Sequence, residues 1–414
     1  MIRRRVRLGV AVLALVALAG GLACGGPRAQ EIVFWEFWPA ADIQPLIDKF
    51  EKEHPGFKVR LEPLTWQDGE QKITAAIESG AVPDLCEIGS TWMPQLLATG
   101  RLADWSAGTA DLRPVLRGWP LCTLGDASYG LPWVLGTRVL FYNKDLFARA
   151  GLDSSQGPET WEELAAAAAA IEKLGGGVHG YGVQGGEHHV LFKKFMPFAW
   201  GNGGRILSDD LSTAVFDSPE NREALEFYLS LRDVGIMAKQ EVLDRQFREG
   251  RLGFDLSGAW LLKSLPRDAP KLRFGVALVP RPSLDQGTHG SFAGGQLLVS
   301  FQASKRKEAA LQLARFLVSA ENAGDLASRA RSVQPATIGA DTSAVYRDRP
   351  LEQVLLRQFD TAYFTPNHPR WTDMEAAIED AIERALLDHS RPRAEVAAAA
   401  TAEAQQKIAE LVHQ

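Results

Sequence analysis

A regular alternation of strand and helix patterns limits the fold of this chain more than any other feature of its sequence. Residues 32–35 (IVFW) form a short apolar run typical of a buried strand, and residues 43–50 then place apolar side chains at positions i, i+3, i+4 and i+7, as on one helix face. The order returns as the strand pattern FKVRLEPL, the helix pattern GEQKITAAIESG, the strand pattern PDLCEIG and the helix pattern TWMPQLLATG. Strands that alternate with helices in this way predict parallel β-α-β units and an α/β fold.

The later part of the chain continues the alternation less regularly. We expect a strand over Arg138–Tyr142, another in LGFDLSGAW and a third in GGQLLVS, with helices between them. Thr160 and Glu163 have the spacing of a capping box, in which two side chains close the start of a helix. Thr372 and Glu375 repeat that spacing in WTDMEAAIEDAIERALL and predict a second capped helix start.

The first three predicted strands each end beside a tryptophan and a polar residue. The carboxyl ends of parallel strands meet at one edge of a sheet, where ligands of such folds bind. One such coincidence would carry little weight, whereas three in succession predict a polar and aromatic ligand site. The residues concerned are Glu36 with Trp38, Trp66 with Asp68, and Ser90 with Trp92.

The chain contains eleven tryptophans, and we expect several of them in the site. A single tryptophan is more often part of a core, and Trp105, Trp119 and Trp161 are best explained by packing. Trp35 is the weakest candidate, because strand alternation points it away from Glu36. Further candidates lie beside glycines, at strand ends or before helix starts: Trp133, Trp200, Trp260 and Trp371.

Aromatic rings combined with Asp, Glu, Asn and Arg side chains suit sugars. The C–H-rich face of a pyranose packs on a ring, and its hydroxyl groups need hydrogen-bond partners. The same residue types could hold an organic cation such as a polyamine. A secreted glycoside hydrolase would also line a cleft with tryptophans, with Glu36 and Asp68 as its two carboxyls. The chain has no hydrolase motif, so the sequence favours a binding protein over an enzyme and predicts no catalytic residue.

Two other motifs carry less weight. The glycines of WGNGGR lack the G-K-[ST] ending of a phosphate loop and follow a helix, so Gly201 is expected as a helix C-cap, with Trp200 and Asn202 at a pocket rim. The histidines of Glu187–His189 have no further cluster of metal-ligand residues, which indicates a surface loop. We therefore predict no metal and no cofactor.

The N-terminus has the pattern of an export signal. Four arginines precede the apolar run Leu8–Leu18, and small residues then lead to Cys24. We expect residues 1–23 to be a signal peptide and residues 24–30 a tether. The setting of Cys24 resembles a lipoprotein cleavage site, although Gly21 stands where a leucine is usual, so ordinary signal cleavage stays a rival.

Charge and cysteine content narrow the partners further. Without the four arginines of residues 1–23, 41 basic residues would face 51 acidic ones, and the formal net charge would be −10 instead of −6. An acidic exported chain is a poor partner for nucleic acid. Cys86 and Cys122 are expected as two buried thiols, although an oxidising compartment leaves a disulfide open.

Taken together, several stretches resemble family 1 extracellular solute-binding proteins of ABC importers, the group of maltose-, trehalose- and glycerol-phosphate-binding proteins. The stretches are FWEFWP, YGLPWVLGTRVLFYNKDLF, ETWEELAAAA, FAWGNGGRIL, SPENREALEFY, SGAW and SFAGGQLLVSFQASKRKEAALQLARFL. The resemblance implies a two-lobed periplasmic-binding-protein fold of type II, with lobes formed by residues 31–140 with 292–335 and by 141–291 with 336–414. It also implies a small-molecule sugar as ligand, the permease and ATPase of an ABC transporter as partners, contact with the membrane only through a lipid anchor, and a monomer.

The resemblance also assigns positions to the cleft between the lobes. It includes the strand-end residues named above and the tryptophans at 133, 200, 260 and 371. It adds Gly136, Thr137, Asn202, Gly203, Gly294, Gly295 and Arg370.

Overall fold

The structure, a computed structural model, describes residues 29–340 and 344–413. The predicted signal peptide, Cys24 and all but the last two residues of the predicted tether lie outside this part. Within it, no helix combines the length and the apolar character that a membrane span requires.

A seven-stranded sheet forms the centre of one lobe, which we call the N-terminal lobe. Its strand order is β13-β6-β12-β3-β1-β2, and β14 pairs with β12. The strands are β1 (Gln30–Glu36), β2 (Phe57–Pro63), β3 (Leu85–Gly89), β6 (Leu131–Thr137), β12 (Ser291–Val299), β13 (Gln334–Pro335) and β14 (Ala362–Phe364). β1 is parallel to β2 and β3, which confirms the predicted β-α-β units, whereas β12 is antiparallel to β3 and β6.

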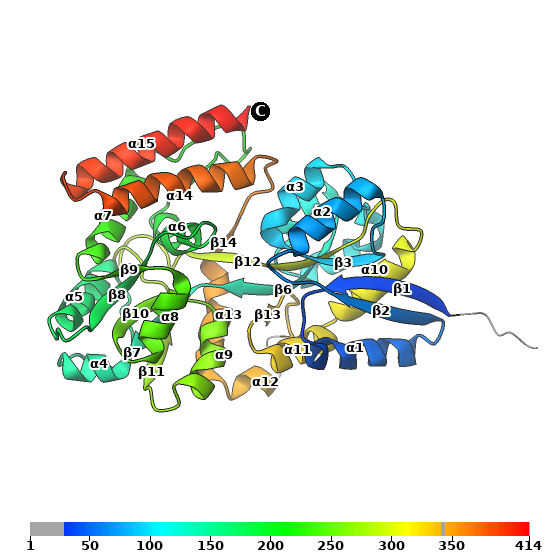
Figure 1. Cartoon of the computed structure of the whole chain (residues 1–414), viewed down its shortest axis with the longest axis horizontal. Coiled ribbons are helices and arrows are strands. Elements are labelled where there is room, and N and C mark those ends of the chain that lie inside the picture. Colours follow the sequence, from blue (N-terminus) through cyan, green and yellow to red (C-terminus); the bar gives the residue numbers. More distant parts are fainter. Residues whose placement is uncertain (1–28, 341–343, 414) are drawn as a thin grey trace, which may run out of the picture.

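Helices cover both faces of this sheet, so each face has its own apolar core. The helices are α1 (Ala40–Glu53), α2 (Gly69–Ser79), α3 (Met93–Ala98), α10 (Lys307–Leu317) and α11 (Ala320–Ala330). α1, α10 and α11 pack on one face, and α2 and α3 pack on the other (Figure 1). A small hairpin of β4 (Thr123–Leu124) and β5 (Ala127–Ser128) belongs to the connection before β6.

A five-stranded sheet forms the centre of the second lobe, which we call the C-terminal lobe. Its order is β11-β7-β10-β8-β9, with β8 parallel to both of its neighbours. The strands are β7 (Val139–Asn143), β8 (His179–Gln184), β9 (Gly235–Ala238), β10 (Leu252–Ser257) and β11 (Phe274–Ala277). One face is covered by α4 (Lys144–Arg149), α5 (Trp161–Glu172), α6 (Leu191–Gly201) and α7 (Pro219–Arg232). Two further helices, α14 (Trp371–Leu387) and α15 (Arg393–Val412), form an outer layer on α6 and α7 (Figure 1). The other face of the sheet packs on α8 (Gln240–Arg248), α9 (Ala259–Asp268) and α13 (Pro350–Gln358), which follows the short α12 (Ala344–Arg347).

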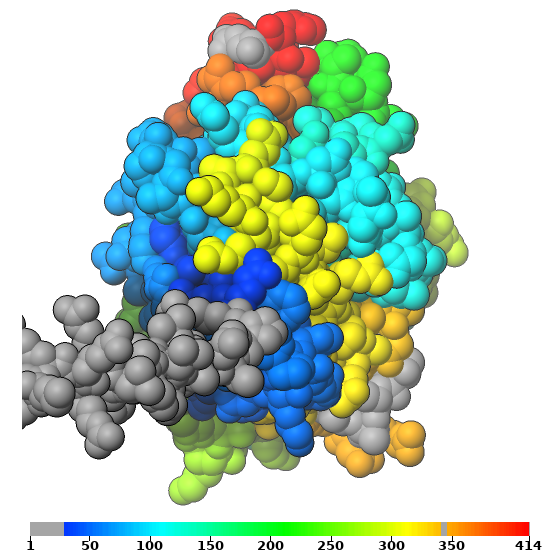
Figure 2. Space-filling view, turned by 90° about the vertical axis from the view of Figure 1, so that its right-hand side faces the viewer, coloured from blue at the N-terminus to red at the C-terminus, as the bar shows by residue number. Residues whose placement is uncertain are grey.

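The chain passes between the lobes several times. Arg138 is the single residue between β6 of the larger sheet and β7 of the smaller one, and β12 later returns the chain to the larger sheet. In Figure 2 the residues that follow β12, drawn in yellow, lie between the blue and the cyan residues of the first third of the chain. The proposed division of residues between the lobes stays a prediction, and β14, which lies inside 336–414, pairs with the larger sheet.

Helix starts test the predicted capping boxes. The Thr160 hydroxyl accepts the Glu163 backbone N–H at 3.2 Å and the Glu163 carboxylate accepts the Thr160 N–H, which confirms the first box. The second prediction was wrong, because α14 begins at Trp371 and has no side-chain cap. The expected buried thiols are confirmed, since Cys86 and Cys122 are both free and buried.

Two buried carboxyls hold the backbone that follows β1. A Glu36 carboxylate oxygen accepts the N–H of Trp38, and a Glu87 oxygen accepts the N–H of Phe37 at 2.9 Å. Glu36 is 2% exposed and Glu87 is fully buried. Burial raises the pKa of both, and the charge of Glu36 raises the pKa of Glu87 further. These carboxyls therefore fix the loop that carries Phe37 instead of facing a ligand.

We predict that Glu87→Gln reduces the loss of stability as pH rises. Because the folded-state pKa of Glu87 lies above 4.5, the folded protein binds more protons than the unfolded chain above that pH, and its stability falls towards the folded pKa. Glutamine still accepts the Phe37 N–H without carrying charge. Urea midpoints between about pH 5 and pH 8 should fall less steeply in the variant. Glu53→Gln, at the exposed end of α1, is the control, and identical slopes in wild type and Glu87→Gln would contradict the prediction.

Candidate functional site

A cleft of about 450 Å³ opens between the two lobes. Its volume falls in the range of roughly 300–1,000 Å³ that is usual for small-molecule sites. One wall follows the ends of β2 and β3 in the N-terminal lobe, the floor is formed by β6 and β12, and the other wall comes from the C-terminal lobe.

Aromatic rings form the N-terminal wall. Trp66 is 50% exposed and stacks on Phe37, with ring centroids 4.1 Å apart and planes 16° apart. Trp92 lies 5.4 Å from Trp66 and also lines the cleft, beside Ser90 and Thr91. Because Phe37, Trp66 and Trp92 follow β1, β2 and β3, the predicted convergence of strand ends is confirmed. Phe37 supports Trp66 from behind, so one face of the Trp66 ring stays open to the cleft.

Glycines form the floor. Gly294 and Gly136 face each other across the β12–β6 ladder, and the Gly295 N–H donates to the Ser90 hydroxyl at 3.1 Å. A Cβ atom on Gly136 would meet nothing within 4 Å, so a side chain there would extend into open space. Gln296 continues the floor, and its side-chain oxygen is buried without a hydrogen-bond partner among the described residues.

The wall on the side of the C-terminal lobe, which we call the C-terminal wall, consists of Lys193 and Trp260 together with Arg138 between the two sheets and Phe292 at the start of β12. Trp260 is 36% exposed, its indole N–H donates to Asp244 at 3.2 Å, and the Arg138 guanidinium carbon lies 4.5 Å from its ring centroid. Burial lowers the pKa of Arg138 to about 10, which leaves the group cationic at neutral pH.

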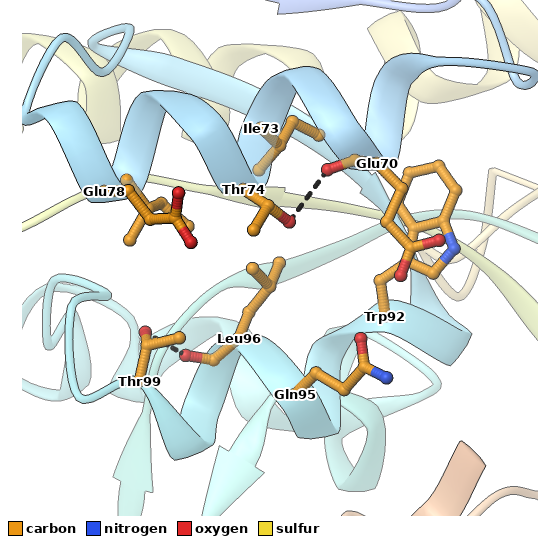
Figure 3. A pocket seen from close by; sticks show the side chains of 9 residues that line it. Glu70, Ile73, Thr74, Glu78, Trp92, Gln95, Leu96 and Thr99 are labelled. Atoms are coloured by element: carbon orange, nitrogen blue, oxygen red, sulfur yellow. Dashed lines mark hydrogen bonds between the residues drawn. The ribbon is translucent and has the colours of Figure 1, made fainter. Parts of the chain in front are cut away.

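A second, smaller cavity of about 160 Å³ lies between α2 and α3 of the N-terminal lobe. Figure 3 shows Ile73 and Leu96 facing each other across it, with Glu70, Gln95 and Trp92 at one end. Burial raises the pKa of the Glu70 carboxyl, whereas the charge of His189 in the other lobe lowers it. This cavity is mainly apolar and belongs to one lobe, so we take the interlobe cleft as the candidate site.

The cleft contains seven of the seventeen residues that the sequence assigned to the site. These are Trp66, Ser90, Trp92, Gly136, Trp260, Gly294 and Gly295. Thr137 lies beside them but faces the protein, where its hydroxyl donates to the Phe292 carbonyl at 2.7 Å.

The other candidates in the N-terminal lobe lie elsewhere. Trp38 and Trp133 are buried in the core beneath the sheet, with ring centroids 5.8 Å apart. Glu36 is occupied by the backbone of its own loop. Asp68 is exposed and accepts a hydrogen bond from the Thr65 hydroxyl, and it does not line the cleft.

The remaining candidates of the C-terminal lobe also lie outside the cleft lining. Trp371 is fully buried and donates to Glu375 one turn later at 2.9 Å. Trp200 is 4% exposed and stacks on Tyr363. The remaining three stand outside the cleft lining: Asn202 donates to the Glu220 carbonyl, Gly203 takes a positive φ of 92° after α6, and Arg370 pairs with Asp373.

The sequence did not assign several residues of the cleft lining to the site, among them Arg138, Lys193, Phe292 and Gln296, and it also missed Phe37 behind Trp66. Arg138 directly follows the predicted Gly136 and Thr137, and Gln296 follows Gly294 and Gly295, so neighbourhood in the chain could have indicated both. Lys193 had no such signal, because nothing in the sequence places α6 beside β12.

Lobe-to-lobe contacts also lie outside the cleft. Gln95 of α3 donates to the Thr372 hydroxyl of α14 at 3.2 Å, and Asn367 donates to the Thr123 carbonyl at 3.0 Å. Across the described residues, no group of three or more His, Cys, Asp or Glu side chains could hold a metal ion.

Known proteins resemble the chain over most of its length. The family model of the bacterial extracellular solute-binding proteins matches residues 39–324. A binding protein of Brucella abortus is 29% identical over 327 residues, which are 77% of this chain and 78% of that protein. The sn-glycerol-3-phosphate-binding periplasmic protein UgpB of Escherichia coli is 26% identical over 328 residues, 73% of each chain.

A solved structure extends the likeness to the whole fold. The cyclic α-maltosyl-1,6-maltose binding protein of Arthrobacter globiformis is 27% identical and matches with a TM-score of 0.82 over 93% of this chain and 99% of that one. The two lobes therefore have the type II periplasmic-binding-protein fold. The chain belongs to the family of bacterial extracellular solute-binding proteins.

Proposed function

We propose that this chain captures a carbohydrate in the interlobe cleft and delivers it to the permease of an ABC importer. The observation that supports this proposal most strongly is the exposure of two tryptophan side chains. Of the eleven tryptophans, Trp66 and Trp260 are the most exposed, and they line the same cleft from opposite lobes. Exposed apolar surface gathered in one cleft is typical of a binding site, and indole rings suit the C–H-rich faces of a sugar.

Polar groups beside the rings suit the hydroxyls of such a ligand. Ser90, Thr91, Gln296 and Ser332 line the cleft and offer both donors and acceptors. The unpaired side-chain oxygen of Gln296 supports a ligand hydroxyl, because a buried polar atom without a partner costs free energy.

Family membership supports the transport role. Proteins of this family are exported solute-binding components of ABC transporters and are binding proteins rather than enzymes. The relatives' ligands include a cyclic maltosyl-maltose and sn-glycerol-3-phosphate, so the family alone leaves the ligand class open.

The two alternatives from the sequence both require carboxylates in the cleft. Among the described residues that line it, none is Asp or Glu, and an organic cation would meet Arg138 and Lys193. A glycoside hydrolase needs two carboxyls flanking one bond, whereas Glu36 serves its own loop and Asp68 stands outside the cleft lining. These observations favour the carbohydrate receptor.

The proposal includes closure of the two lobes on the ligand. The crossing segments near Tyr142, Gly294–Gly295 and Gln334–Pro335 would act as the hinge. A ligand that contacts Trp66 from one lobe and Trp260 from the other binds the closed state better and shifts the population towards it.

We predict that Trp260→Ala weakens sugar binding by about 1–3 kcal/mol, since it removes one of two ring platforms. A thermal-shift screen over mono- and disaccharides, polyols and polyamines identifies the ligand, and calorimetry then measures the loss. Binding of spermidine or putrescine but no sugar would replace the carbohydrate by a cation, and new reducing ends on incubation with oligosaccharides would indicate a hydrolase.

A matched pair of glycine variants tests the location of the site. Gly136→Leu should abolish binding without a large loss of stability, because its side chain has open space only in the cleft. Gly56→Leu, in the turn before β2, also meets nothing within 4 Å and should bind normally. Normal binding by Gly136→Leu would place the ligand elsewhere.

We expect the radius of gyration from small-angle scattering to fall when the identified ligand saturates the protein. Closure brings the lobes together, and tryptophan fluorescence should change at the same ligand concentrations. Gly136→Leu with the same ligand should show neither change. An unchanged radius and unchanged fluorescence in the wild type at saturation would contradict the closing motion.

We also propose that Cys24 is lipidated and anchors the exported protein. On detergent phase partitioning, the wild type should enter the detergent phase, and Cys24→Ser should stay in the aqueous phase. A lipid-modified N-terminal Cys24 in the mass spectrum would support the anchor, whereas an unmodified N-terminus near Glu31 would contradict it and leave export intact.

A further inference from the structure

The charged residues of the cleft are all of one sign. Of the fifteen residues that line it, only Arg138 and Lys193 carry a formal charge, and both are cations. This contrasts with the whole chain, whose formal net charge is −6. The positive lining is therefore a local feature of the site.

The two cations stand close to one aromatic ring. The Arg138 guanidinium carbon and the Lys193 ammonium nitrogen each lie 5.4 Å from the Phe292 ring centroid. Burial lowers the pKa of Lys193, and the charge of Arg138 lowers it further. The two positive charges near this ring repel each other, and an anion bound to both groups would offset that repulsion.

No carboxylate of the described residues forms an ion pair with either group, since none lies within 4 Å. The Arg138 Nε atom is buried without a hydrogen-bond partner among the described residues, and the Nη1 atom donates a long hydrogen bond to the Thr137 carbonyl at 3.5 Å. By contrast, the neighbouring Lys194 faces the smaller sheet, where its ammonium lies 3.7 Å from a carboxylate oxygen of Asp255. Of these two consecutive lysines, Lys194 therefore pairs inside the C-terminal lobe, whereas Lys193 lines the cleft.

The acidic groups around this wall are bound within the C-terminal lobe. Asp244, which raises the pKa of Arg138, accepts hydrogen bonds from Gln240 at 2.7 Å and from Trp260 at 3.2 Å. Asp244 itself stands outside the cleft lining.

The acids that face Lys193 are engaged in the same way. Glu375 and Glu379 both raise its pKa. Glu375 accepts from Trp371 and contacts the His189 ring, and Glu379 accepts the backbone N–H groups of His189 and Phe192. Neither carboxylate lines the cleft.

We propose that the ligand carries an anionic group, a carboxylate or a phosphate ester, and that Arg138 and Lys193 bind it at the Phe292 ring. The inference rests on the proposed function and narrows it to an acidic sugar, with the sugar ring between Trp66 and Trp260. Guanidinium and ammonium groups are the usual partners of both anions. A neutral sugar would leave two half-buried charges uncompensated, which is unfavourable.

Calorimetry with three groups of ligands tests the inference on the full chain. The groups are neutral mono- and disaccharides, the corresponding uronic acids, and the corresponding sugar phosphates together with glycerol phosphate. We expect at least one anionic ligand to bind at least 10-fold more tightly than its neutral counterpart, and its affinity to fall as salt rises. The uronate and phosphate arms separate the two kinds of anion.

Three variants locate the anion. Arg138→Gln and Lys193→Gln should each weaken binding of the anionic ligand by about 10- to 100-fold and reduce its salt dependence. Lys263→Gln removes the same charge from an exposed position on α9 and should bind normally. If Arg138→Gln misfolds, Lys193→Gln and the salt dependence of binding to the wild type still show whether the anionic group is bound here.

The possible results test the anionic group of the ligand and the proposed carbohydrate receptor separately. Tight, salt-independent binding of a neutral sugar overturns the anionic group and leaves the carbohydrate receptor standing. Binding of glycerol phosphate without any sugar supports the anion site and overturns the carbohydrate. An anionic ligand that binds Lys193→Gln and Arg138→Gln as tightly as the wild type overturns the assignment of these residues, and failure of all three groups to bind overturns both proposals.

Discussion

The close approach of β12 to β6 is the contact on which the site depends. A Cβ atom on Gly295 would lie 2.0 Å from the Val134 carbonyl oxygen, and one on Gly294 would lie 2.7 Å from the Phe292 ring. Only glycine fits at position 295, where the atom that a side chain would meet is backbone, whereas a side chain at position 294 would have to displace the Phe292 ring. The two strands can therefore lie close together at this point. The glycines add no side chains to the floor of the cleft, whereas both walls carry large side chains. A side chain at Gly295 would separate two central strands of the larger sheet and move the segments that connect the lobes.

The N-terminal wall shows how far a sequence pattern can lead. Alternation of strands and helices predicts that β1, β2 and β3 end at one edge, and it correctly brought Trp66 and Trp92 together there. The error concerned the faces of β1. Phe34, Glu36 and Trp38 share one side of the strand, and because Phe34 is fully buried, the other two are buried with it. Phe37 points the other way and stacks on Trp66. Alternation from Phe34 would have given the right assignment for Glu36, Phe37 and Trp38.

The C-terminal wall could not be predicted in the same way, because it is assembled by tertiary packing. Trp260 and Trp371 both follow a loop and open a helix, and the sequence treats them alike. In the structure Trp260 lies over Gly258, whose missing side chain makes room for the ring, and it remains open to the cleft. Trp371 turns inward and pairs with Glu375. The sequence analysis also named no strand over residues 131–137, although β6 lies inside the larger sheet and is covered on both faces, which buries Trp133.

Arg138 connects recognition with the geometry of the two lobes. It is the only residue between β6 and β7, so its neighbours on either side are held by ladders of two different sheets. Its guanidinium packs on Trp260 of one lobe, while Thr137, one residue earlier, is hydrogen-bonded to the β12 backbone. A rotation of the lobes must change the backbone around this residue, because the strands on both sides are constrained by their partners. A ligand group bound to Arg138 is thus bound to the crossing segment itself, and its binding free energy acts directly on the angle between the lobes.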